Sequence, residues 1–257
     1  MNIFTRFNFY NNLNRVFALG FVVLLMAQII FWSRTENINP DVGIVPNVPT
    51  MKAAKAAAFG DEQFYFRVKS LEIENAGDSF GRFTSFKRYD YSKLYGWFSL
   101  LSSIDKESNY PPTLATNYYA ATPNKSDTKY IVQYLDEFAS EDVTKHWWWI
   151  YRAFHIANNT LGDKKLALNL ALKLSNSNSE DVPIWAKQLP AFIYESTNDD
   201  CAAFLFIENL LTEYNKKDQS KIDHKEMEFM RYFIKKKIYE LEQKNFSADK
   251  CKKKSKK

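Results

Sequence analysis

An uninterrupted apolar run lies near the start of the chain. Residues 16–32 read VFALGFVVLLMAQIIFW and include no charged side chain. A transmembrane helix needs about 20 predominantly apolar residues, so this run meets the lower limit for crossing a bilayer. A cleaved signal peptide is the alternative, but such peptides end in a small-residue cleavage site. The sequence Phe31-Trp32-Ser33 provides no site of that kind, which favours an uncleaved signal anchor.

The residues on either side of the run indicate its orientation. Arg6 and Arg15 lie in the N-terminal flank, residues 1–15, and the first 34 residues contain no acidic side chain. Because basic residues are retained on the cytoplasmic side, we expect the N-terminus in the cytoplasm and the C-terminal body outside it. Residues 33–60 follow, and their stretch TENINPDVGIVPNVPT has three prolines and one glycine. This composition predicts an extended linker.

Between residues 61 and 215 the apolar positions have a helical period and recur about every 36 residues. Segments 113–138, 149–174 and 185–210 align at this offset. In each, apolar residues occupy positions i, i+1, i+4, i+5 and i+8 of a second helix, a stripe broad enough to pack on two neighbours. The pattern predicts stacked pairs of helices. The aligned residues are Tyr130, Leu166 and Ala202; Ile131, Ala167 and Ala203; Tyr134, Leu170 and Phe206; Leu135, Ala171 and Ile207; and Phe138, Leu174 and Leu210.

Polar turn residues support the same alignment. Asp127, Asp163 and Asp199 coincide, each where a turn ends and a helix is expected to begin. A short carboxylate at such a position caps free N–H groups and favours the positive end of the helix. A weaker fourth copy precedes these three, with its first helix expected over residues 61–75 and its second around residues 94–102.

This arrangement resembles the tetratricopeptide-type helical repeat. Ala167 and Ala203 stand where that family has a small residue, and Trp149 and Trp185 roughly match its aromatic residue at the start of the first helix. The chain departs from the family in its period of about 36 residues instead of about 34, in lacking the glycine of the first helix, and in carrying Pro190. Together with the anchor, the resemblance implies a membrane-bound repeat protein of bacterial type. It also implies a concave groove that binds a protein or peptide, with no catalysis and no cofactor.

Two further segments follow the repeats. Residues 221–243 have an apolar face and a charged one, as expected of the polar-faced end helix that stacked repeats need for solubility. Residues 244–257 are rich in lysine and are expected to remain unfolded. The sequence therefore predicts an all-α fold: an N-terminal transmembrane helix, a helix-pair repeat superhelix and a C-terminal capping helix. The apolar face of that helix comprises Ile222, Met227, Met230, Ile234, Ile238 and Leu241, and the solvated face Lys235, Lys236, Lys237 and Glu240.

The segment HWWWIYRAF, residues 146–154, contains three consecutive tryptophans. Consecutive residues of a helix point about 100° apart, so one surface cannot bury all three. Trp149 aligns with Trp185 and is expected in the core. Either all three tryptophans fill space between helices, or Trp147 or Trp148 anchors a bound chain, since Trp, Tyr and Arg dominate binding hot spots. The second hypothesis predicts a partner-binding groove formed by Trp147, Trp148, Arg152, His155, Tyr118, Tyr119 and Lys187.

The charge and the cysteine content limit the kinds of site that the chain can form. Six lysines of the terminal tail account for the net charge of +5, so a body that binds nucleic acid is not indicated. The three histidines have no metal-ligand spacing, and no metal site or cofactor is expected. Two cysteines cannot form a disulfide framework. Cys201 lies in an apolar helical run and is expected to be buried, whereas Cys251 is expected to be a free, exposed thiol.

The sequence Gly77-Asp78-Ser79-Phe80 superficially resembles the nucleophile motif of GDS-type hydrolases. That chemistry needs the serine after a strand, with a downstream His–Asp pair. The preceding run FYFRVKSLEIENA instead predicts a helix, which favours an inter-helix turn.

From the anchor and the repeats we expect a single-pass protein of a bacterial inner membrane whose periplasmic body scaffolds another protein. The alternatives are a structural subunit of a larger membrane complex and a hydrolase that uses Ser79.

Overall fold

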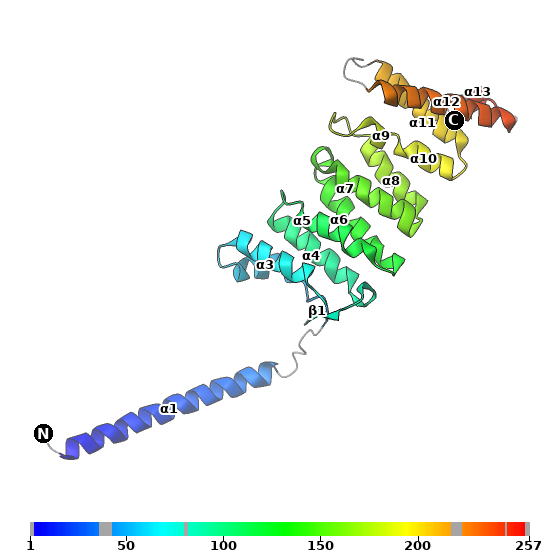
Figure 1. Ribbon diagram of the computed structural model, residues 1–257. Coiled ribbons are helices and arrows are strands. Elements are labelled where there is room, and N and C mark those ends of the chain that lie inside the picture. The colour runs from blue at the N-terminus through cyan, green and yellow to red at the C-terminus, as the bar shows by residue number, and fades with distance from the viewer. Residues whose placement is uncertain (1–2, 36–42, 80–81, 217–222, 245, 255–257) are drawn as a thin grey trace. The chain divides into compact units, whose positions relative to one another are not determined.

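The computed structural model describes residues 3–35, 43–79, 82–216, 223–244 and 246–254 (Figure 1). The predicted all-α class is confirmed: helices dominate the described residues, with one short hairpin. The chain divides into two compact units, Met1–Val42 and Gly43–Lys257.

The first unit is a single apolar helix. Helix α1, Ile3–Thr35, extends over 33 residues. Its segment Val16–Arg34 is long and apolar enough to cross a membrane, and none of that segment is buried. Apolar side chains without a protein core are typical of a helix that faces lipid. The N-terminal apolar helix is therefore a signal sequence or an anchor.

The second unit consists of short helices joined by turns. An antiparallel hairpin of β1 and β2, with Asp78 opposite Phe83, and the 3₁₀ turn η1 lie between α3 and α4. The elements are α2 (Met51–Ala57), α3 (Glu62–Glu74), β1 (Asp78–Ser79), β2 (Arg82–Phe83), η1 (Phe86–Arg88), α4 (Tyr91–Ile104), α5 (Tyr110–Asn117), η2 (Tyr119–Ala121), η3 (Lys125–Asp127), α6 (Thr128–Ser140), α7 (Val143–His155), the π-helical turn η4 (Ile156–Leu161), α8 (Lys164–Ser175), α9 (Ile184–Lys187), α10 (Leu189–Ser196), α11 (Asp200–Asn215), α12 (His224–Gln243) and α13 (Ala248–Lys254).

These helices pack mainly on their neighbours in the chain. Helix α3 contacts α4, α4 contacts α6, and α6, α7 and α8 follow in order (Figure 1). Helix α8 then contacts α10, α10 contacts α11, and α11 contacts both α12 and α13. A continuous apolar core fills the space from Val45 to Ile193, and a second cluster joins α10, α11 and α12. The tertiary contacts therefore form a succession of local interfaces.

The predicted second helices are α6, α8 and α11. In all three, the aligned residues at i+1, i+5 and i+8 are buried. Asp163 accepts from the N–H of Leu166 at 2.9 Å, and Asp199 accepts from the N–H of Ala202 at 3.0 Å. The cap predicted at Asp127 is wrong, because η3 precedes α6 and this carboxylate accepts from the side chain of Asn124 instead.

The first helices of the pairs are unlike one another. Helix α5 has only 8 residues, whereas α7 has 13 and continues into η4. In the third pair, Pro190 lies in the first turn of α10, and the expected helix is divided into α9 and α10. Proline removes a backbone donor and clashes with the preceding turn, which accounts for the break. The repeat superhelix stays a prediction.

The predicted linker is wrong over the part that the structure describes, while its residues 36–42 lie outside that part. Val45 is buried, and the indole N–H of Trp97 donates to the carbonyl of Pro46 at 2.9 Å. Val48 lies so close to Gly96 that a Cβ there would meet its Cγ2 at 2.8 Å. Thr50 then caps α2. The alternation of apolar residues with prolines lets this segment pack on α4.

Helix α12 matches the predicted capping helix, with Ile222 lying outside the described residues. Met227, Met230 and Leu241 of its apolar face are buried. The prediction that Lys237 is solvated is wrong, because this side chain is 1% exposed. Its ammonium group is neutralised by carboxylates 2.7 Å away on Glu195, 3.0 Å away on Asp200 and 2.6 Å away on Glu240.

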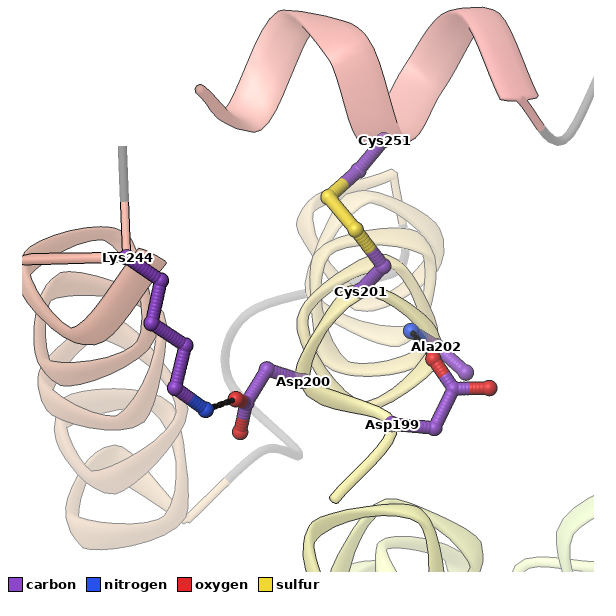
Figure 2. Close-up of a disulfide and its surroundings, with 6 residues drawn as sticks. All are labelled: Asp199, Asp200, Cys201, Ala202, Lys244 and Cys251. Carbon is purple, nitrogen blue, oxygen red and sulfur yellow. Dashed lines mark hydrogen bonds and ion pairs between the residues drawn. A yellow bond between two sulfur atoms is a disulfide. The ribbon is translucent and has the colours of Figure 1, made fainter. Parts of the chain in front are cut away.

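Two further predictions for the C-terminal segment are wrong. Residues 248–254 form helix α13, where an unfolded tail was expected. Cys251 is fully buried and forms a disulfide with Cys201, so it is neither free nor exposed (Figure 2). Lys252 pairs with Glu208 at 2.6 Å, which adds a second contact to α11. Because disulfides persist in oxidising compartments, this bond suggests that the body is extracytoplasmic.

Candidate protein-binding surface

Helix α7 begins with a cap and a kink that position the three tryptophans. The Asp142 carboxylate accepts from the N–H of Lys145 at 3.1 Å. His146 then has φ −111° and ψ 16°, outside the helical range. Regular helix follows the kink, so the directions of Trp147, Trp148 and Trp149 are set by the helical segment after His146.

Trp149 is a core residue, as predicted. It is buried, and its indole N–H donates to the side-chain oxygen of Asn109 at 3.0 Å. Asn109 precedes the first residue of α5. Trp149 therefore links α7 to the start of α5 through this hydrogen bond.

The other two tryptophans lie on the side of α7 that meets α9. There they form an aromatic cluster consisting of Trp147, Trp148, Tyr151 and Trp185. The Trp185 ring lies 5.9 Å from that of Trp147 and 5.0 Å from that of Tyr151, both edge-on. The Trp148 ring lies 5.7 Å from that of Trp147 and 5.3 Å from that of Tyr151. Trp148 is 44% exposed and Trp185 is 36% exposed, so the cluster presents two indoles to solvent.

Three other residues of the predicted groove also reach the surface. Arg152 lies one turn after Trp148 and donates to the side-chain oxygen of Asn117 at 3.1 Å. His155 follows in the next turn and is exposed. Tyr118, next to Asn117, is exposed along one side and contacts Phe86 edge-on at 4.9 Å. The α7 residues of this set thus form an exposed ridge beside the end of α5.

Tyr119 and Lys187 do not join that ridge. Tyr119 is fully buried, and its hydroxyl donates to the carbonyl of Ile73. Burial raises the pKa of the Tyr119 phenol above its usual range. Lys187 is also buried, donates to the carbonyl of Ser179 at 2.9 Å, and lines a separate polar cavity of about 200 Å³ with Tyr214. Neither side chain lies where a surface partner would contact it.

A second candidate site is a polar cavity of about 340 Å³ lined by α4, α6 and the start of α7. Ser102 and Tyr134 share a buried hydrogen bond of 2.7 Å in its wall. The imidazole of His146 lies 4.6 Å from the ring of Phe138. Burial, and to a smaller extent the charge of Lys145, lower the pKa of His146 below 6.5. Charged side chains complete the lining, among them Lys106, Glu107 and Glu141.

Ser79 lies in β1, within the α3–α4 connection. The segment before it is helix α3, as predicted, and β1 pairs with no strand but β2 among the described residues. Gly77 has φ 78°, and a Cβ there would collide with the hydroxyl of Tyr89. The turn conformation and this close approach explain the glycine without reference to catalysis. Among the described residues no group of three or more His, Cys, Asp or Glu could hold a metal ion.

The chain matches no family model, and neither a curated protein nor a solved structure is significantly similar to it. The resemblance to tetratricopeptide-type repeats therefore remains an expectation from the sequence.

Tyr151 is the member of the aromatic cluster that the sequence analysis did not single out. A signal was available, because residues at i+3 and i+4 share a helix face. Tyr151 stands at those spacings from Trp148 and Trp147. Trp185 was aligned with Trp149 in the repeat and was not placed in the groove, yet its ring packs on Trp147 and Tyr151.

Proposed function

We propose that the protein is a membrane-anchored helical scaffold that binds another protein or a peptide and catalyses no reaction itself. The observation that carries the proposal is the partly exposed aromatic cluster beside Arg152. Tryptophan, tyrosine and arginine contribute a large share of the binding energy in protein interfaces. Aromatic rings also bury a large area at a small cost in conformational entropy.

The proposal places the body in the periplasm of a bacterium, held at the inner membrane by residues 16–32. The lack of acidic residues before Glu36 and the Cys201–Cys251 disulfide support that location. Successive helix pairs with buried positions about 36 residues apart support a repeat scaffold of the tetratricopeptide type. Such stacks bind partners along an extended surface.

The test is purification of the full chain from native membranes in mild detergent after brief cross-linking, with partners identified by mass spectrometry. We expect a protein partner with the wild type and at least about tenfold less of it with Trp148→Ala, because loss of a hot-spot residue costs about 2 kcal/mol or more. Tyr232→Ala is the control, since this tyrosine is an exposed aromatic residue of α12 outside the cluster.

Circular dichroism melts accompany each variant. An unchanged melt for Trp148→Ala together with loss of the partner supports the proposal. Equal recovery of the partner with both variants, or a wild type that purifies without one, contradicts it. A partner that remains at fixed stoichiometry through every step favours the alternative, a structural subunit of a larger membrane complex.

A further inference from the structure

Helix α3 is apolar on two opposite faces. Tyr65, Phe66 and Ile73 are buried against the body. On the other face Phe64 is 66% exposed, and Val68 and Leu71 are also exposed. Their spacing of i, i+4 and i+7 aligns these three side chains along one stripe. The outer stripe, Phe64, Val68 and Leu71, contributes nothing to the core of the described chain.

The turn before α3 exposes a further aromatic side chain. Phe59 is 96% exposed, and its φ of 48° is in the left-handed region. Bulky residues rarely adopt that region because of steric strain. Folding alone gives no reason for a phenylalanine here, since a glycine or an asparagine would fit the turn better. A partner outside the folded body would account for Phe59.

Two cations beside the stripe have no carboxylate partner among the described residues, although the four basic and four acidic side chains of residues 51–75 balance in number. Every carboxylate between residues 51 and 75 has a partner: a cap at Asp61, lysines at Glu62 and Glu72, and the Tyr110 hydroxyl at Glu74. Lys52 and Arg67 are exposed and make no ion pair within the part of the chain that the structure describes. A surface with exposed apolar rings and unpaired cations matches the boundary of an anionic bilayer, where rings enter the headgroup region and cations meet phosphates.

The short connection between α1 and the body favours the membrane as the surface that the stripe contacts. Only residues 36–42 separate Thr35, the last residue of α1, from Gly43, the first described residue of the body. Eight peptide units reach at most about 30 Å. If α1 spans a bilayer, the start of the body stays near that surface at a high effective concentration. The stripe on α3 follows about twenty residues later in the chain.

We propose that the outer stripe of α3 and Phe59 dock on the surface of the bilayer that holds α1, with Lys52 and Arg67 on anionic headgroups. The proposal rests on the anchor part of the proposed function and is independent of the aromatic cluster. It assigns the stripe to lipid and leaves the cluster on α7 and α9 to the protein partner.

The test uses the full chain with Phe64 replaced by the photoreactive p-benzoylphenylalanine. The protein is reconstituted in vesicles of phosphatidylcholine and phosphatidylglycerol, irradiated and analysed by mass spectrometry. The matched control carries the same probe in place of Tyr232, which is 63% exposed on α12. We expect a phospholipid adduct at position 64 that exceeds the control about tenfold, the ratio that burial of one aromatic ring produces. The double variant Lys52→Gln, Arg67→Gln should lower the adduct at least about fivefold.

A lipid adduct at position 64 no greater than that at position 232 overturns the proposal. An adduct with a second copy of the chain does the same, because it assigns the stripe to a dimer. Intact mass shows whether residues 1–35 are retained, and their cleavage removes the anchor on which docking depends. Co-purification with Trp148→Ala reports on the aromatic cluster separately, so failure of the scaffold proposal leaves the lipid result readable.

Discussion

The disulfide between α11 and α13 makes a definite prediction about stability (Figure 2). The perturbation is the double substitution Cys201→Ser, Cys251→Ser. The two cysteines are 50 residues apart, and closing a loop of this length lowers the entropy of the unfolded chain by the equivalent of about 4 kcal/mol at 25 °C. For a body of this size, about 4 kcal/mol corresponds to roughly 10 °C in melting temperature.

Unfolding of the double variant should begin at α13. Helix α13 is held by the disulfide, by burial of Cys251 against Phe204 and Leu241, and by the Lys252–Glu208 ion pair. An exposed ion pair contributes only about 0–1 kcal/mol. Helix α12 keeps the buried ion pairs of Lys237 when the disulfide is removed. We therefore expect α13 to open before the rest of the body melts.

The assay combines thermal melts followed by circular dichroism with limited trypsin digestion. The double variant should melt lower than the wild type and lose the lysine-rich end of α13 first. Reductant should lower the melt of the wild type to that of the variant and leave the variant unchanged. A wild type that melts at the same temperature with and without reductant would refute the argument. Ready alkylation of both thiols in intact cells would refute the extracytoplasmic location of the body.

Two further predictions concern the charges around Lys237. Lys237→Met should destabilise the C-terminal helices by about 2 kcal/mol in denaturant titration, because it removes a buried cation that Glu195, Asp200 and Glu240 share. Lys236→Met, at an exposed neighbour, should cost under about 1 kcal/mol. Equal costs would contradict the argument. Acid should loosen the same helices. A hydrogen bond from Lys244 lowers the pKa of Asp200. Burial raises the pKa of Glu195, but the hydrogen bonds and charges of Lys237 and Lys236 together outweigh it and lower that pKa. Depressed carboxyl pKa values stabilise the fold above the unfolded pKa of about 4 and lose that contribution as the pH falls through the native values. The protection factors of the α12 amides, which compare observed exchange with the intrinsic rate at the same pH, should therefore fall between about pH 5 and pH 2, and the Lys237→Met variant should show a smaller change.

The helices were predictable where local patterns determine them. The apolar stripes of α6, α8 and α11 and the caps at Asp163 and Asp199 depend on residues a few positions apart. The apolar helix α1 is likewise visible in composition alone. The burial of Lys237 was not predictable, because its partners Glu195 and Asp200 lie about 40 residues away in the sequence. The Cys201–Cys251 disulfide was not predicted for the same reason, because the two cysteines meet only when the folded chain packs α13 on α11.

In the candidate surface, too, local helix geometry was predictable and contacts between distant segments were not. The core position of Trp149 and the exposure of Trp148 follow from helix geometry around one axis. Tyr119 and Lys187 were placed in the groove because aligned first helices were assumed to be regular. Tyr119 instead belongs to a 3₁₀ turn after the short α5, and Lys187 ends α9 at the break before Pro190. Repeat alignment therefore predicts which segments are helical better than it predicts which side chains share a surface.

The succession of neighbour-to-neighbour interfaces also has a consequence for how the chain acquires its fold. Helix α7 makes most of its contacts with α6 and α8, its neighbours in the chain. Local contacts of this kind form quickly, since little loop-closure entropy must be overcome before they stabilise the chain. If α1 keeps the N-terminus on the cytoplasmic side, as proposed, the body follows α1 across the membrane from α2 onward, and each interface can form as the next helix emerges. Such vectorial folding exposes little apolar surface at any moment and limits aggregation during export.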